Sequence, residues 1–258
     1  METTVNQHPK YQKLFIFLGF LFLTNAIVAE IIGTKIFSLE ASLGLPPASI
    51  SLGGEIFNFN LTAGVMLWPV VFILTDIINE YFGKKGVKKL SYLASGMLVY
   101  SFIMILAAMN LKGADFWITS RQQQGIPEMD TAFNAILGQG LFIILGSLTA
   151  FLIGQMVDAF VFEQVRKRTG NNMIWLRATG STLISQFIDS YVVLFIAFYW
   201  GADWSAVTVL KIGTINYIYK LTVAILLTPA LYAVHAGIDR YLGKELSEKM
   251  MKTAMEGK

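Results

Sequence analysis

Charged and amide side chains lie inside long apolar stretches of this sequence. Carboxylates occur at Asp76, Asp158 and Asp189, and an amine occurs at Lys220. A charged side chain at the centre of a membrane-spanning helix costs on the order of 3 kcal/mol to insert. Such groups must face one another or a wet cavity. We therefore interpret them as the part of the chain that binds a ligand.

The spacing of these groups repeats. Gln155-x-x-Asp158 and Gln186-x-x-Asp189 each place an amide three residues before a carboxylate, and Asp76-x-x-Asn79 is a related pair. Residues i and i+3 share a helix face, so each stretch presents a carboxylate beside a carboxamide. A carboxylate can accept hydrogen bonds from two N–H groups on an amidine-like edge, while an amide side chain can both donate and accept hydrogen bonds. These groups suit a planar ligand with several polar atoms.

The full candidate site adds other polar side chains from the same apolar stretches. Asp76 and Asp158 each lie about two turns before a basic cluster, whereas Asp189 and Lys220 are nearer the middle of their stretches,. The polar cavity is therefore expected to run from the bilayer centre toward the cytoplasm. The predicted substrate-binding residues are Asn25, Asp76, Asn79, Gln155, Asp158, Ser181, Gln186, Asp189, Tyr217 and Lys220.

Several of the polar residues have a simpler interpretation. Glu80 could be solvated at the membrane interface, and Glu30 could lie in a loop or pair with Lys35. Gln155 could join two helices by a hydrogen bond, which is a common use of amides in membranes. Lys220 and one acid could form a structural ion pair. We favour a ligand role for Asp158 and Asp189 because both belong to the repeated pairs.

The elements that must position these groups are apolar and long. The chain of 258 residues is 55% hydrophobic and 14% charged, with a mean hydropathy of +0.57. A helix needs roughly 20 residues to cross a bilayer. We predict an all-α integral membrane protein, in which 1–258 form a single domain of six transmembrane helices. Their expected ranges are 14–34, 61–80, 90–110, 133–159, 176–200 and 208–235.

Basic residues predict the orientation of these helices. They gather at 10–13, 84–89, 166–168 and 240–258, which six crossings place on one side. Cytoplasmic loops carry an excess of lysine and arginine, so both termini are expected in the cytoplasm. On the other side, apolar and polar residues alternate over 49–60 around a glycine pair, which predicts a small β-hairpin. The hairpin could be a lid or an ordered connection.

Several enzyme classes are excluded by missing motifs. The sequence has no cysteine, which excludes disulfides, thiol nucleophiles and iron–sulfur clusters. Gly83-Lys84 and Gly243-Lys244 lack the upstream glycine of a phosphate-binding loop, and neither H-E-x-x-H nor G-x-S-x-G occurs,. We predict no enzyme, no cofactor and no metal site. An intramembrane enzyme that uses paired acids such as Asp158 and Asp189 is the alternative.

Partners follow from charge and small residues. The net charge of +3 gives no indication of direct nucleic-acid binding. The expected partners are the lipid bilayer and a small planar ligand, which the family resemblance given below implies is nucleobase-like. Gly146, Ala150 and Gly154 form a stripe at four-residue spacing that lets another helix approach closely,. Tight packing inside the bundle explains this stripe best, although it leaves a homodimer open.

Three longer stretches, together with two residues, resemble the queuosine precursor transporter family, also known as vitamin uptake transporters. The resemblance covers nearly the whole chain, over about 25–232. The stretches and residues that carry it are Thr75-Asp-Ile-Ile-Asn-Glu-Tyr-Phe-Gly83, Gly154-Gln-Met-Val-Asp-Ala-Phe-Val-Phe162, 181–195, Tyr217 and Lys220.

The resemblance implies a six-helix importer in the inner membrane. Its substrates would be 7-deazapurines, such as 7-cyano- or 7-aminomethyl-7-deazaguanine, for queuosine salvage in tRNA modification. A carboxylate could clamp the N–H edge of such a base, and its carbonyl oxygen needs a donor such as Gln155, Asn25 or Lys220. A membrane substrate-binding subunit that needs a separate ATPase is the other transport hypothesis.

Overall fold

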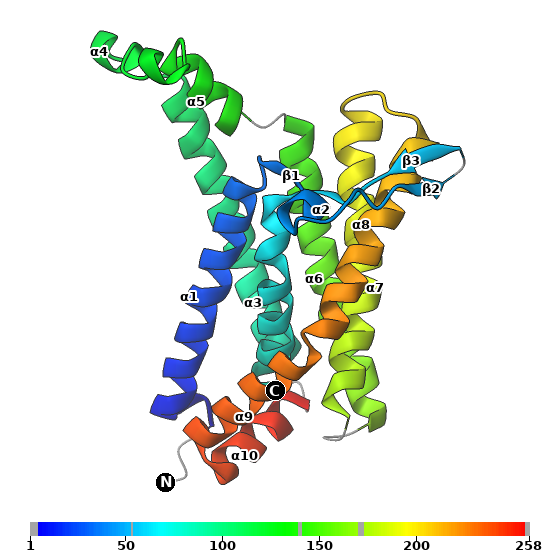
Figure 1. Ribbon diagram of the computed structural model, residues 1–258. Coiled ribbons are helices and arrows are strands. Elements are labelled where there is room, and N and C mark those ends of the chain that lie inside the picture. Colours follow the sequence, from blue (N-terminus) through cyan, green and yellow to red (C-terminus); the bar gives the residue numbers. More distant parts are fainter. Residues whose placement is uncertain (1–4, 53, 139–140, 170–172, 256–258) are drawn as a thin grey trace.

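The computed structural model describes residues 5–52, 54–138, 141–169 and 173–255. Within them, five helical stretches are long and apolar enough to cross a membrane. They pack side by side as an elongated bundle, with small strands at one end and short helices at the other (Figure 1). The predicted class, an all-α membrane protein, is confirmed. These five stretches are Pro9–Ile32, Trp68–Met109, Met129–Thr169, Trp175–Trp200 and Ala206–Leu226.

The first membrane helix, α1 (Pro9–Ile32), follows the single turn η1 (Val5–Gln7). His8 caps its N-terminus, because the imidazole Nδ1 accepts the backbone N–H of Lys10 at 3.2 Å. Proline at the first helical position is favourable, since its missing N–H would have had no partner there. The helix is apolar around most of its surface, as expected for an element between lipid and protein.

Helix α3 (Trp68–Met109) contains a non-helical residue, Gly83, with φ 67° and ψ −178°. Two helices were predicted here, over 61–80 and 90–110, separated by a basic loop. The structure instead continues helical backbone through residues 84–89 and places the break at Gly83 alone. Lysine stems can lie along an apolar surface while their ammonium groups reach water, so these lysines do not require a loop.

The break in α3 reverses the chain direction. α3 and the preceding turn η2 (Ala63–Met66) pack along α1. As the chain proceeds, these contacts move from the C-terminal part of α1 to its N-terminal part, and then back toward its C-terminus. In chain order, the contacts are Gly64 with Ala29, Phe82 with Tyr11, and Leu90 with Gly19. α3 therefore consists of two antiparallel segments, 68–82 and 84–109.

A small β structure connects α1 to α3. β1 (Ile36–Ser38) pairs antiparallel with β4 (Asn60–Thr62), and β2 (Ile50–Leu52) pairs antiparallel with β3 (Glu55–Phe57). The short helix α2 (Leu39–Ser42) lies between β1 and β2 in sequence. The predicted hairpin is thus confirmed in the form of β2 and β3.

Glu40 in α2 holds this connection together. Its Oε1 accepts the backbone N–H of Phe59 at 2.8 Å and that of Ala48 at 3.3 Å. The Ser38 hydroxyl donates to Oε2 at 3.1 Å. These donors favour the ionised carboxylate, so the pKa of Glu40 is lowered, chiefly by the bond from Phe59.

The next stretch leaves the bundle and returns. α4 (Asp115–Ile118), η3 (Gln122–Gln124) and α5 (Met129–Leu137) lie beyond the end of α3 and project away from the other helices (Figure 1). α6 (Leu141–Thr169) then crosses the bundle. The predicted helix 133–159 therefore corresponds to two helices, and residues 139–140 between them lie outside the described part.

Of the last two predicted membrane helices, the first agrees with the structure and the second is divided into two helices. α7 (Ile174–Leu194) continues into a π-helical turn, η4 (Phe195–Trp200), which agrees with the prediction of 176–200. α8 (Ala206–Leu226) ends before Leu227, and α9 (Thr228–Leu242) begins after it, so the single helix predicted over 208–235 is wrong. Pro229 explains the break, because proline has no N–H for the previous turn and clashes with it.

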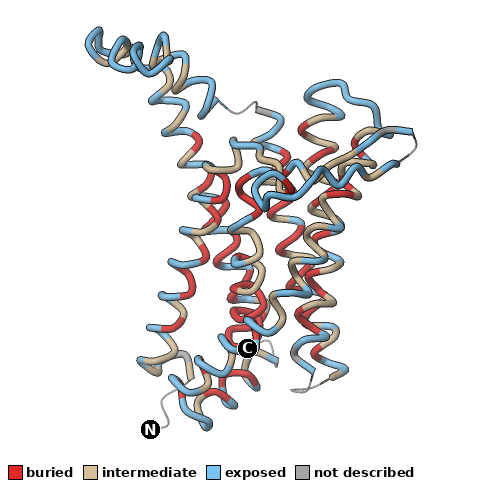
Figure 2. The backbone as a smooth tube through the Cα atoms, viewed as in Figure 1, coloured by how far each residue is buried: buried red, intermediate tan, exposed pale blue. Residues whose placement is uncertain are grey.

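α9 and α10 (Lys244–Met255) cover one end of the bundle, at the same end as the start of α1 (Figure 1). Buried residues gather where the helices face one another, while the outer faces are exposed (Figure 2). The apolar core joins α1, α3, α6, α9 and α10. Several of the polar residues predicted from the sequence, among them Asp76, Asp158 and Gln186, are buried between the helices of the bundle.

Candidate functional site

Two carboxylates meet in the bundle interior, from α3 and α6. Asp158 is fully buried and Asp76 is 5% exposed. The Ser185 hydroxyl of α7 donates to Asp158 Oδ1 at 3.2 Å. The hydroxyls of Ser181 and Thr182, one turn earlier on α7, lie beside both carboxylates. Three helices thus bring two acids and three hydroxyls together.

Several polar atoms beside these acids have no hydrogen-bond partner among the described residues. They are Asp76 Oδ1, Asp158 Oδ2, Gln155 Nε2 and both Oε1 and Nε2 of Gln186. The other amide atom of Gln155 accepts the Thr75 hydroxyl at 2.9 Å. Buried polar groups are nearly always satisfied, so donors and acceptors left over in one region indicate a place that water or a ligand can occupy.

A cavity lies next to this group, between the first segment of α3, α7 and α8. Its volume is about 40 Å³, which is room for about three water molecules. Asp76, Thr182, Gln186 and Lys220 contribute polar groups to its wall, and most of the other lining side chains are aromatic or aliphatic. A mostly apolar pocket with a few converging polar groups is the usual form of a small-molecule site.

Asp189 and Lys220 form an ion pair between α7 and α8, through Oδ2 and Nζ. Lys220 also lines the cavity, so the pair stands at its edge. Glu30 of α1 is 8% exposed and accepts a hydrogen bond from Ser147 of α6. The interpretation of Glu30 as a loop residue is therefore wrong.

Three predicted site residues, Asn25, Asn79 and Tyr217, belong neither to the cavity wall nor to the polar groups described above. The Asn25 amide donates to the Leu21 carbonyl of its own helix at 2.8 Å. The Asn79 amide donates to the Ala159 carbonyl at 3.3 Å and so joins α3 to α6. Tyr217 packs edge-on against an aromatic ring of α7, with 5.4 Å between ring centres. The structure gives these side chains packing roles.

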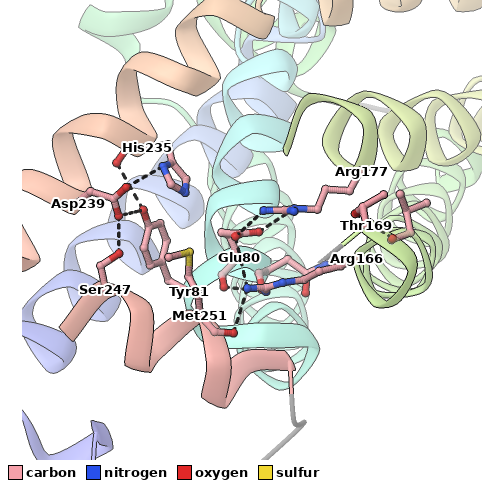
Figure 3. Close-up of polar contacts among 11 residues, drawn as sticks. Glu80, Tyr81, Arg166, Thr169, Arg177, His235, Asp239, Ser247 and Met251 are labelled. Carbon is pink, nitrogen blue, oxygen red and sulfur yellow. Dashed lines mark hydrogen bonds and ion pairs between the residues drawn. The ribbon is translucent and has the colours of Figure 1, made fainter. Parts of the chain in front are cut away.

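A buried ion cluster at the α9–α10 end was not expected from the sequence (Figure 3). Glu80 is fully buried, and Arg177 donates to it twice, from Nε at 3.0 Å and from Nη2 at 2.6 Å. Arg166 approaches the same carboxylate at 3.3 Å and donates to the Met251 carbonyl of α10 at 3.0 Å. The alternative of a solvated Glu80 is therefore wrong.

A second polar network lies beside this cluster (Figure 3). Asp239 of α9 accepts the Tyr81 hydroxyl at 2.7 Å and the Ser247 hydroxyl of α10. His235 Nδ1 lies 3.1 Å from the same carboxylate. Together, the cluster and this network attach α9 and α10 to the break in α3. No signal in the sequence distinguishes Arg166 from a basic residue that only sets membrane orientation.

These features define an integral membrane protein whose interior holds a small, mostly apolar cavity with unpartnered polar groups in and beside its wall. The family described as "Putative vitamin uptake transporter" matches residues 62–234, from the end of β4 into the first half of α9. The chain belongs to this family, which confirms the resemblance seen in its motifs.

Named relatives are similar over most of their length. A "Probable queuosine precursor transporter" of Bacillus subtilis (strain 168) is 29% identical over 184 residues, which cover 69% of this chain and 73% of the relative. A "Queuosine precursor transporter" of Escherichia coli (strain K12) is 25% identical over 211 residues, covering 80% and 86%. No solved structure gives a significant match.

Proposed function

We propose that this chain imports a 7-deazapurine precursor of queuosine into the cytoplasm through the cavity between α3, α7 and α8. The relatives named as transporters of queuosine precursors support the substrate class. The observation that carries the proposal is the unpartnered Asp76 carboxylate oxygen beside the unpartnered Gln186 amide. Both residues line the same cavity.

The chemistry of these two side chains matches such a base. A deazaguanine presents a ring N–H and an exocyclic amine on one edge, and the Asp76 carboxylate can accept both. Its carbonyl oxygen can accept from the Gln186 amide N–H, or from Lys220 at the edge of the cavity. The apolar wall, which includes Trp68 and Phe72, suits the faces of a flat ring,.

Binding must widen the cavity. A volume of about 40 Å³ is far below the 300 Å³ or more of ordinary ligand pockets,. The cavity wall includes Leu227 and Thr228, at the break between α8 and α9. This break is the natural place for α8 to move relative to α3, because helices change direction where their backbone bonding is interrupted. Transport then proceeds by alternating access around the site.

We further propose six crossings of the inner membrane by one transporter domain, 1–258, with both termini in the cytoplasm. The reversal at Gly83 makes two crossings out of α3. The basic residues at 84–89 then lie at the same end as α9 and α10, which also carry basic residues. That arrangement agrees with the positive-inside rule.

The absence of cysteine allows a direct test of this orientation. Glu128, before α5, and Glu248, in α10, are both exposed. We expect a membrane-impermeant maleimide to label Glu128→Cys in intact cells, but to label Glu248→Cys only after permeabilisation. Labelling of Glu248→Cys in intact cells would contradict cytoplasmic placement of the C-terminal helices.

Binding to the purified protein tests the function. We expect wild type to bind 7-cyano-7-deazaguanine and Asp76→Asn to bind it about 10- to 100-fold more weakly. Hydrogen bonds to a charged group contribute about 1.5–3 kcal/mol, which corresponds to that range. Titration calorimetry in detergent measures both affinities.

Two controls sharpen the binding test. Asp115→Asn changes an exposed acid in α4, far from the cavity in sequence and structure, and is expected to bind as wild type does. Uptake by wild type alone in liposomes without ATP distinguishes a carrier from a subunit that needs an ATPase. Wild type that binds no 7-deazapurine would overturn the proposed substrate.

A further inference from the structure

The carboxylates of Asp76 and Asp158 form no ion pair with a basic residue among the described residues. Interior cations of the described chain already pair with other acids. Arg166 and Arg177 pair with Glu80, and Lys220 pairs with Asp189. The charged groups around Asp76 are Glu80 on its own helix α3 and Asp158 on α6, while Lys220 on α8 lines the same cavity and pairs with Asp189 on α7. Arg177 on α7 pairs with Glu80, and Glu30 on α1 interacts with Asp189.

Two neighbouring buried carboxylates cannot both remain ionised without a cation. Burial removes the water that stabilises each charge, and the second charge repels the first. The hydroxyls that bond to these acids are neutral: Ser181 and Thr182 reach both carboxylates, and Ser185 reaches Asp158. Pairs of this kind bind a proton jointly, and their titration belongs to the pair rather than to either residue.

The position of the two acids relative to the cavity indicates which of them holds the proton. Each has one buried oxygen without a hydrogen-bond partner among the described residues, Asp158 Oδ2 and Asp76 Oδ1, and Asp158 Oδ1 accepts from Ser185. Asp158 is fully buried and is absent from the cavity wall, whereas Asp76 forms part of that wall. A proton on Asp158 Oδ2 therefore leaves Asp76 ionised, as it must be to accept the N–H edge of a base.

We propose that Asp76 and Asp158 hold one proton between them and that this proton crosses the membrane together with the substrate. The inference rests on the proposed function and assigns its coupling to these two residues. The proton enters from the outer water and binds Asp158, the neutral base binds Asp76, and both leave to the cytoplasmic water. No bond of the substrate changes, and one positive charge moves inward with each base.

Infrared spectroscopy tests the shared proton without any substrate. Wild type should show the C=O stretch of a protonated carboxyl group near neutral pH. Asp158→Asn should remove this band. Asp76→Asn should shift its titration about one pH unit or more toward acid, because the repelling charge is gone. Asp239→Asn, which alters the α9 network outside the site, should leave the band in place. A band that neither site variant changes would overturn the proposal.

Uptake into liposomes tests the coupling. For transport of one proton with each neutral base, an interior made one pH unit more alkaline should raise the final inside-to-outside ratio about tenfold at zero membrane potential. Asp158→Asn should equilibrate the base without responding to the gradient. Equal accumulation with and without a gradient in wild type would overturn the coupling and leave the import function intact. If wild type binds no base, the proposed function fails, and the infrared titration still decides whether the two aspartates share a proton.

Discussion

Glu80→Ala is expected to destabilise the folded protein by about 3–5 kcal/mol, because it leaves two arginines buried without their carboxylate. Glu80 is fully buried, and the side chains of Arg177 and Arg166 are only 1% and 4% exposed. An isolated charge in such a place loses its hydration without compensation. The loss should appear as a much lower midpoint of thermal unfolding in detergent, and as a smaller monodisperse fraction on size exclusion.

Glu163 provides the matched control for this prediction. It also pairs with two basic residues, Lys84 at 3.5 Å and Lys167 at 2.8 Å, but its side chain is 26% exposed. Ion pairs in contact with water contribute about 0–1 kcal/mol, so Glu163→Ala should lower the midpoint only slightly. Equal losses from the two substitutions would show that burial of the Glu80 cluster does not contribute to stability.

Gly83→Ala is expected to prevent correct packing at the cytoplasmic end proposed for the bundle. The backbone of Gly83, with φ 67° and ψ −178°, lies in a region essentially restricted to glycine,. A Cβ there would also come within 2.9 Å of the Ala254 carbonyl oxygen of α10. The strain costs about 1–3 kcal/mol, and the clash with backbone has to displace α10 as well.

Gly96→Ala in the same helix is the control. Gly96 is exposed, has helical backbone, and has no atom within 4 Å of an added Cβ. Alanine favours helix over glycine by about 0.5–1 kcal/mol, so this variant should be as stable as wild type or more so. Protease protection of α10 in solubilised protein measures both. A Gly83→Ala variant that is protected like wild type would contradict the requirement for glycine.

The apolar stretches predicted the membrane helices well, because length and hydrophobicity are properties of the chain itself. Predictions of where helices stop were less accurate. Residues 84–89 were expected in a loop, yet they are helical and Gly83 alone makes the reversal. The break before α9 did have a signal in the sequence, since Pro229 interrupts an otherwise apolar run,.

The repeated amide–acid spacing found part of the candidate site. Asp158 lies beside Asp76, Gln186 lines the same cavity, and Gln155 bonds to the neighbouring Thr75. Asp189 lies at the edge with Lys220 instead. The spacing of residues predicts which side chains share one face of a helix. It does not predict how the helix is rotated about its axis, and therefore which neighbouring helix that face contacts. That rotation depends on packing across the whole bundle. The same limit applies to Glu80, whose two arginine partners come from other helices.

The position of α10 in the chain has a consequence for biosynthesis. Arg166 needs the carbonyl of Met251, and Gly83 packs against Ala254, so both depend on residues translated long after them. While the ribosome is still making α7 and α8, the ends of the earlier helices that α10 later contacts lack these partners. A ribosome stalled within α10 would hold the nascent chain at this incomplete stage, where quality-control proteases could act on it.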